Sequence, residues 1–235
     1  MQIPLILVVN DDGINAPGIR KLISIMNEFG DVVVVAPDSP QSGKGHAITL
    51  DSIIKCDKIN IDDGPQEEYS CSGTPVDCVK LALNKILKRK PDLCVSGINH
   101  GSNSSINVIY SGTMSAAVEA ALGGVPSIGF SLLDYSLEAD FSESEKFIRK
   151  ITKSVLDNGL PGGISLNVNI PKSVIGKKIN GIKICRQAKA KWIEEFDKRQ
   201  DPKNNTYYWL TGKFVNSDNG EDTIDDNINE ENKKK

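Results

Sequence analysis

The sequence has no hydrophobic run long enough to cross a membrane, and its start lacks the basic region and small-residue cleavage site of a secretory signal peptide. It also has no excess of positive charge, because the formal net charge is −3. A broad basic surface for binding a nucleic-acid polymer is therefore not expected. These absences predict a cytoplasmic protein whose partners include neither a membrane nor a nucleic acid.

Cysteine, histidine and aromatic residues are scarce. The five cysteines form no Cys-x-x-Cys pair, so reduced and mostly buried thiols are expected rather than a disulfide framework. Two histidines, His46 and His100, are too few for a histidine-built metal centre, and His100 is expected to lie in a surface loop. Aromatic residues are 6% of the chain, yet six large ones fall between Trp192 and Phe214. This concentration indicates an apolar surface that another surface covers.

The sequence does contain alternating strand and helix signals through its first 160 residues. Continuous aliphatic runs at 5–9 and 32–35 are typical of strands buried on both faces of a parallel sheet. Alternation of this kind predicts an α/β fold with a Rossmann-like, doubly wound, mostly parallel sheet. Further strands are expected at 92–96, 126–131 and 164–169, an antiparallel excursion at 47–72, and helices at 16–28, 75–88, from 111 onward and at 141–157.

The pattern changes after residue 171. Residues 1–171 are expected to form the Rossmann-like domain that carries the site. Segments around 181–185 and 206–215 resemble strands, so residues 172–215 are expected to form a β-rich appendage, a hairpin arm used for oligomerisation. Residues 216–235 carry seven acids and three lysines among polar residues, which predicts a disordered tail.

Polar residues follow several of the expected strands. Asp11 and Asp12 come directly after the first strand, where adjacent carboxylates repel each other unless a cation neutralises them. The loop after the second strand carries Ser39 and Ser42, and Asn99 follows the third. Oxygen ligands of this kind suit Mg²⁺, Mn²⁺ or Ca²⁺ rather than zinc. For the two aspartates taken alone, a solvated turn is the alternative.

The start of one expected helix is suited to binding phosphate. Ser111, Gly112 and Thr113 would offer free backbone N–H groups there, although a tight helix entry alone could explain them. A metal beside a phosphate cradle indicates metal-assisted phosphoryl chemistry. Other candidate substrate contacts, each with a structural alternative, are Asn10, Gly43 and His46.

Five motifs occur along the chain in a characteristic order and spacing. They read Val-Asn-Asp-Asp-Gly-Ile, Ala-Pro-Asp-x-x-x-Ser-Gly-x-Gly-His, Gly-Thr-Pro-x-Asp-Cys-Val, Val-Ser-Gly-Ile-Asn-x-Gly and Tyr-Ser-Gly-Thr-x-x-Ala-Ala-x-Glu-Ala. Over residues 3–215 they closely resemble the SurE family of metal-dependent nucleotidases, which remove phosphate from nucleoside 5′- and 3′-monophosphates. The chain departs from the family pattern after Thr223, where the family continues with a helix and a Tyr-Val-Ser-x-x-Pro strand, and that last strand has no counterpart.

The resemblance implies a Rossmann-like core, a swapped C-terminal hairpin, and a homodimer or homotetramer with one Mg²⁺ or Mn²⁺ per subunit. It assigns a catalytic role to Asp11 and Asp12, and it selects Ser42 over Ser39 as a ligand. The metal ligands that it implies are Asp11, Asp12, Ser42 and Asn99.

Two other functions are open. One is a nucleotide-binding protein that has lost turnover. The other is an aspartyl-phosphate phosphatase with Asp11 as a covalent nucleophile. Such a phosphatase would place its carboxylates two residues apart on one side of the strand, whereas here they are adjacent.

Overall fold

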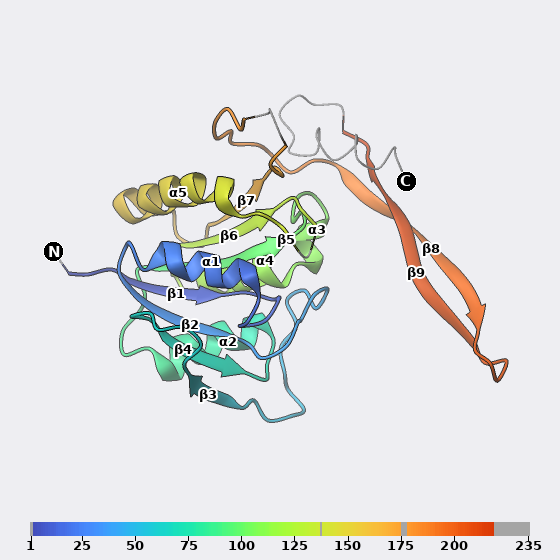
Figure 1. The fold of residues 1–235 in the computed structure, drawn as a ribbon, viewed down its shortest axis with the longest axis horizontal. Helices are drawn as coiled ribbons and strands as arrows, with labels where there is room; N and C mark the ends of the chain where they lie inside the picture. The colour runs from blue at the N-terminus through green and yellow to red at the C-terminus, as the bar shows by residue number, and fades with distance from the viewer. Residues whose placement is uncertain (1, 137, 175–177, 219–235) are drawn as a thin grey trace. The chain divides into compact units, whose positions relative to one another are not determined.

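The computed structural model describes residues 2–136, 138–174 and 178–218, and its main element is a seven-stranded sheet with helices on both faces (Figure 1). The strand order is β3-β4-β2-β1-β5-β6-β7, and every neighbouring pair is parallel except β3 with β4. The predicted α/β, mostly parallel fold is therefore confirmed. The strands are β1 (Leu5–Val9), β2 (Asp31–Pro37), β3 (Cys56–Ile59), β4 (Glu67–Cys71), β5 (Leu93–His100), β6 (Ser127–Leu132) and β7 (Ser165–Ile170).

Two layers of helices bury the sheet. Successive residues of β1 point to opposite faces, so Val8 joins one core with Leu22 while Leu7 joins the other with Ala116. The first core is closed by α1 (Pro17–Met26) and α5 (Glu145–Asn158), and the second by α2 (Pro75–Leu81) and α4 (Gly112–Leu122). Shorter elements are a π-helical turn η1 (Ala82–Ile86), α3 (Asn107–Tyr110) and a 3₁₀ turn η2 (Ser142–Ser144).

Local sequence sets the start of two helices. Thr74 caps α2 in a reciprocal box: its hydroxyl accepts from the backbone N–H of Asp77 at 3.1 Å, and the Asp77 carboxylate accepts from the Thr74 N–H at 2.9 Å. Ser111 caps α4 by accepting from the N–H of Met114 at 3.0 Å. Both helix starts are as predicted. The helix predicted at 75–88, however, is α-helical only as far as Leu81, where α2 changes to the wider π-helical turn η1.

The order of the strands defines where a ligand site can form. From β1 the chain builds outward to β2 and β4, then returns through α2 to β5, which pairs with the other side of β1. The connections that leave β1 and β5 therefore run in opposite directions over the two faces of the sheet. In open α/β sheets the crevice at this switch point, beyond the carboxyl ends of the strands, is where ligands bind.

Among the described residues, 104–106 and 183–218 form a second compact unit, and the described residues of 2–103 and 107–182 form the first. Its described part is an antiparallel hairpin of β8 (Ala190–Gln200) and β9 (Thr206–Asn216). The Asp201 carboxylate closes the turn by accepting from the backbone N–H groups of Lys203 at 2.8 Å and Asn205 at 2.9 Å.

The predicted strand at 206–215 is confirmed, and the one around 181–185 is wrong. In the described residues 178–189 only Arg186 forms an isolated bridge, and Ile184 is 96% exposed. The predicted domain boundaries at 171 and 215 stay predictions, and most of the expected disordered tail lies outside the described residues.

Candidate active site

Asp11 is buried where β1 ends, directly against the start of α4. Its Oδ1 accepts a 2.5 Å hydrogen bond from the Thr113 hydroxyl, and the backbone N–H groups of Gly112 and Thr113 favour its charged form. A Cβ atom on Gly112 would lie only 2.6 Å from the Asp11 Cβ. Burial raises the pKa of Asp11 in spite of these hydrogen bonds. The helix terminus thus partly compensates a carboxylate that remains costly to ionise.

Asp12 is part-buried and only partly satisfied. Its Oδ2 atom is buried and has no hydrogen-bond partner. Burial first, and then the charge of Asp11, raise the pKa of Asp12 to about 6, although His100 lowers it through its charge and its backbone N–H. Two adjacent carboxylates, one with an unpartnered buried oxygen, form a site that a divalent cation would stabilise.

Asn99 lies on the neighbouring strand β5, beyond an irregularity in its pairing. The register with β6 shifts between Ser96 and Asn99, and irregularities of this kind re-aim side chains beside active sites. The Asn99 amide group donates to the backbone oxygens of His100 at 3.2 Å and Gly101 at 3.0 Å. Both donors point to the backbone, so the amide oxygen is left to accept or to ligate a metal.

Two backbone hydrogen bonds fix the loop after β2 at the same edge of the sheet. The N–H of Gln41 donates to the backbone oxygen of Asp11 at 2.7 Å, and the N–H of Gly45 donates to the backbone oxygen of Tyr110 at 3.2 Å. Between them Ser42 is exposed, and Gly43 has φ +73° with open space where a Cβ would be. The predicted convergence of this loop with Asp11 and the start of α4 is therefore observed.

Two of the candidate substrate-binding residues, Asn10 and His46, interact with other parts of the protein. The Asn10 amide donates to the Gly13 oxygen at 2.8 Å and closes the turn after β1, although its buried Oδ1 has no partner. The His46 ring lies 2.9 Å from Glu119, which also pairs with Lys80 at 2.5 Å. Burial opposes ionisation of Glu119, but the bonds from Lys80 and His46 outweigh it and lower its pKa.

The site contains one residue that the sequence analysis placed elsewhere. His100 is part-buried beside Asp12, and Phe141 packs edge-on against its ring with centroids 5.2 Å apart. The available signal was its position directly after Asn99 in the same motif.

The donor set fits a hard cation. Among the described residues no three His, Cys, Asp or Glu side chains converge to hold a metal. A site with only two carboxylates suits Mg²⁺, which commonly keeps water and substrate phosphate oxygens in the rest of its shell. Asn99 and Ser42 could supply an amide and a hydroxyl oxygen.

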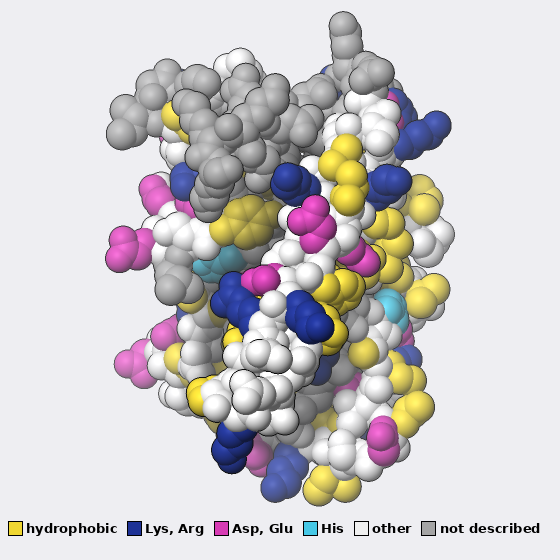
Figure 2. Space-filling view, turned by 90° about the vertical axis from the view of Figure 1, so that its right-hand side faces the viewer, with side chains coloured by type: hydrophobic (Ala, Val, Ile, Leu, Met, Phe, Trp, Pro, Cys, Tyr) yellow, Lys and Arg dark blue, Asp and Glu magenta, His cyan; other side chains and the backbone are white. Residues whose placement is uncertain are grey.

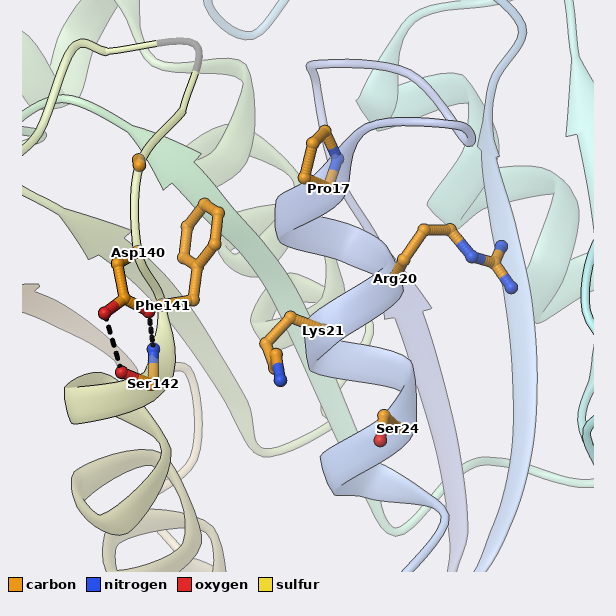
Figure 3. Close-up of a pocket in the computed structure, with 8 residues that line it drawn as sticks. Pro17, Arg20, Lys21, Ser24, Asp140, Phe141 and Ser142 are labelled. Carbon is orange, nitrogen blue, oxygen red and sulfur yellow. Dashed lines mark hydrogen bonds between the residues drawn. The ribbon is translucent and has the colours of Figure 1, made fainter.

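A separate groove of about 500 Å³ lies between α1 and residues 139–142 (Figure 3). Its charged side chains already have partners: Arg20 pairs with Glu68 at 2.6 Å, and Lys21 with Glu145 at 2.8 Å. Asp140 accepts from Ser142 at 2.9 Å. The charged side chains of the groove are thus already paired, and neither Asp11 nor Asp12 lines it.

On the face drawn in Figure 2, acidic, basic and hydrophobic side chains are interspersed, and charges of one sign do not gather in one large patch. In the part of the chain that the structure describes, each helix is too short or too polar to span a bilayer.

Comparisons with known proteins give a consistent result. The family model described as "Survival protein SurE" matches residues 6–194. The 5′-nucleotidase SurE of Christiangramia forsetii is 68% identical over 221 residues, covering 94% of this chain and 85% of the relative. That of Flavobacterium johnsoniae is 68% identical over 220 residues with the same coverage. The crystal structure of the SurE protein from Aquifex aeolicus has a TM-score of 0.75 and 41% identity, covering 89% of this chain and 83% of that one.

Proposed function

Because this chain belongs to the SurE family, we propose that it is a 5′-nucleotidase, a phosphatase that hydrolyses nucleoside 5′- and 3′-monophosphates to nucleoside and phosphate with a divalent cation. One observation carries the proposal: the unpartnered buried oxygen of Asp12 lies beside the buried carboxylate of Asp11, at the switch point of the sheet. Two relatives at 68% identity, each named 5′-nucleotidase SurE, support it. We place the enzyme in the cytoplasm.

The proposed ligands of one Mg²⁺ or Mn²⁺ are Asp11, Asp12, Ser42 and Asn99. When bound, the cation would polarise a phosphoryl oxygen and supply an activated water. Asp11 and Asp12 hold the negative charge that attracts it, and the Asn99 amide is oriented by the backbone oxygens of His100 and Gly101. Ser42 comes from a loop tied to Asp11 through Gln41.

The substrate phosphate would lie between this loop and the start of α4. Open space at Gly43 leaves room for it, and Ser111, Gly112 and Thr113 begin the helix on the other side. The backbone N–H groups of Gly112 and Thr113 already stabilise the Asp11 carboxylate. They can therefore bind the substrate phosphate only if the start of α4 interacts with both anions. Asp11 and Asp12 are adjacent rather than two residues apart on one side of the strand, which favours direct attack by water over an aspartyl phosphate.

A substrate-by-metal panel tests this function. After exhaustive treatment with EDTA we expect no phosphate release from AMP, GMP, CMP or UMP. Without the cation the paired carboxylates are not neutralised, and neither the phosphoryl oxygen nor the attacking water is activated. Mg²⁺ or Mn²⁺ should restore it. Phosphate is measured colorimetrically, and hydrolysis in ¹⁸O-water with acid quench looks for a phosphoenzyme. Full activity after chelation, or a trapped aspartyl phosphate, would contradict direct metal-assisted hydrolysis; binding of nucleotide without turnover would identify a binding protein.

The hairpin of the second unit supports a homo-oligomer. Alternation along β8 and β9 puts Phe196 and Tyr208 on one face and Ile193 and Trp209 on the other, and these four side chains are between 49% and 65% exposed. An isolated two-stranded hairpin is marginally stable in water. We infer that this arm packs on another copy of the chain, giving a homodimer or a homotetramer.

Replacing Tyr208 and Trp209 together by Ser should weaken the dimer by at least ~10-fold, because both faces of the hairpin lose an aromatic side chain. Multi-angle light scattering across a concentration series measures this. Lys203→Ser, in the turn of the same hairpin, is the matched control and should leave the dimer unchanged. A monomeric intact chain at micromolar concentration would refute the assembly.

A further inference from the structure

We propose that Asn167 and Asn169 of β7 are positioning residues that hold the cation ligand Asn99 in place, a role that rests on the proposed function. They lie on the strand beyond β6, two positions away from β5, which carries Asn99. They act through residues 100–103, which follow Asn99 in the chain and are hydrogen-bonded to β7 at Asn103.

The orientation of the Asn99 amide depends on that segment. Its two donors reach the backbone oxygens of His100 and Gly101, at 3.2 and 3.0 Å. These oxygens direct the amide oxygen only if they are themselves fixed. Gly101 is held by its N–H, which donates to the Leu132 oxygen at the end of β6 at 2.8 Å. Beyond Gly101 the segment leaves the sheet and needs other partners.

Asn103 supplies these partners through three hydrogen bonds. Its N–H donates to Asn169 Oδ1 at 2.9 Å, and its backbone oxygen accepts from Asn167 Nδ2 at 2.8 Å. Its own side-chain amide donates to the buried Ser131 hydroxyl at 2.9 Å. Both backbone groups of a buried residue in an irregular segment are thus satisfied by side chains of β7, where a regular element would have used the backbone.

The two β7 amides also fix each other. Residues two apart on a strand share a face, and Asn169 Nδ2 donates to Asn167 Oδ1 at 2.8 Å. This bond orients both amides, because each then presents the other end of its amide group to Asn103. Asparagine is disfavoured in strands, yet β7 has two among its six residues. Their hydrogen bonds to Asn103 give a physical reason for this composition.

Two variants test the role. Asn169→Asp keeps the acceptor for Asn103 but sets an oxygen against Asn167 Oδ1, and Asn167→Ala removes the donor to the Asn103 oxygen. We expect each to raise the Mn²⁺ dissociation constant by ~10–100-fold, the usual effect of losing a residue that orients a metal ligand. Free Mn²⁺ is measured by electron paramagnetic resonance, per folded molecule as judged by circular dichroism.

The kinetics separate positioning from general destabilisation. With a loosened ligand, kcat should recover at saturating Mn²⁺, whereas loss of folded protein would lower kcat at every concentration. Asn158→Ala is the matched control, because this exposed amide makes a similar 2.8 Å bond to the Ser154 oxygen far from β5, and its Mn²⁺ affinity should equal that of the wild type.

The outcomes separate the inference from the function beneath it. A wild-type protein that binds no Mn²⁺ would overturn the proposed metal site itself. A wild type that binds Mn²⁺, with unchanged affinity in both Asn169→Asp and Asn167→Ala, would overturn the positioning role alone. Weaker binding in these two variants, but not in Asn158→Ala, is the result that the inference requires.

Discussion

Replacing Asp12 by Asn is expected to lower kcat/KM for a nucleoside monophosphate by roughly 10³-fold or more, the scale seen when a group that stabilises transition-state charge is removed. The unpartnered Oδ2 atom that would ligate the cation becomes an amide nitrogen or a weaker amide oxygen. Asp11→Asn should have an effect of similar size, since it removes the other charge of the pair.

The same substitution should stabilise the cation-free protein. Asp12 ionises near pH 3.8 in the unfolded chain but with a pKa of about 6 in the folded protein, where burial and the charge of Asp11 disfavour the carboxylate. A raised pKa gives stability that is complete below pH 3.8 and is lost as pH rises through 6. Ionised Asp12 therefore lowers the free energy of unfolding at neutral pH by about 1–2 kcal/mol, after reduction for its partial exposure to solvent.

Urea unfolding of EDTA-treated protein at pH 4 and pH 7.5 measures this effect. Asp12→Asn should match the wild type at pH 4 and exceed it at pH 7.5, while kinetics with Mn²⁺ report the loss of activity. Asp157→Asn is the control, because this exposed carboxylate pairs with Lys153 on α5. Near-wild-type turnover in a metal-stripped and reconstituted Asp12→Asn sample would exclude Asp12 as a ligand.

Replacing Gly112 by Ala is expected to lower kcat/KM by about 10²-fold, although neither Asp11 nor Asp12 is itself replaced. The new Cβ would lie 2.6 Å from the Asp11 Cβ and 2.9 Å from its Oδ2, so either the start of α4 or Asp11 must move. A displacement of about 1 Å in a site of this kind costs roughly 10²-fold in rate. Alanine is otherwise favourable in a helix, so folding should survive.

Steady-state kinetics of Gly112→Ala, with its thermal melt as a check on folding, measure the effect. Gly162→Ala is the matched control, because no atom lies within 4 Å of the Cβ added there. If Gly112→Ala kept full activity, the close approach of α4 to Asp11 would have no part in catalysis.

The sequence by itself determined the class of fold, and it selected the candidate residues of the site. Buried aliphatic runs such as 32–35 admit little but a parallel strand, and the caps Thr74 and Ser111 begin helices through bonds to their own neighbours. Local chemistry of this kind is encoded within a few residues. The motif residues Asp11, Asp12 and Asn99 can therefore be selected from the sequence alone.

Only the tertiary structure decided which hydrogen-bond partners the candidate side chains have. His46 is engaged by Glu119, 73 residues further along the chain, and the Asn99 amide is oriented by a segment that β7 holds. The segment around 181–185 alternates apolar residues as a strand does, yet the described residues there belong to no strand. Hydrogen bonds between residues far apart in the chain decide these outcomes, and the positions of such partners follow from the packing of the sheet rather than from any local pattern.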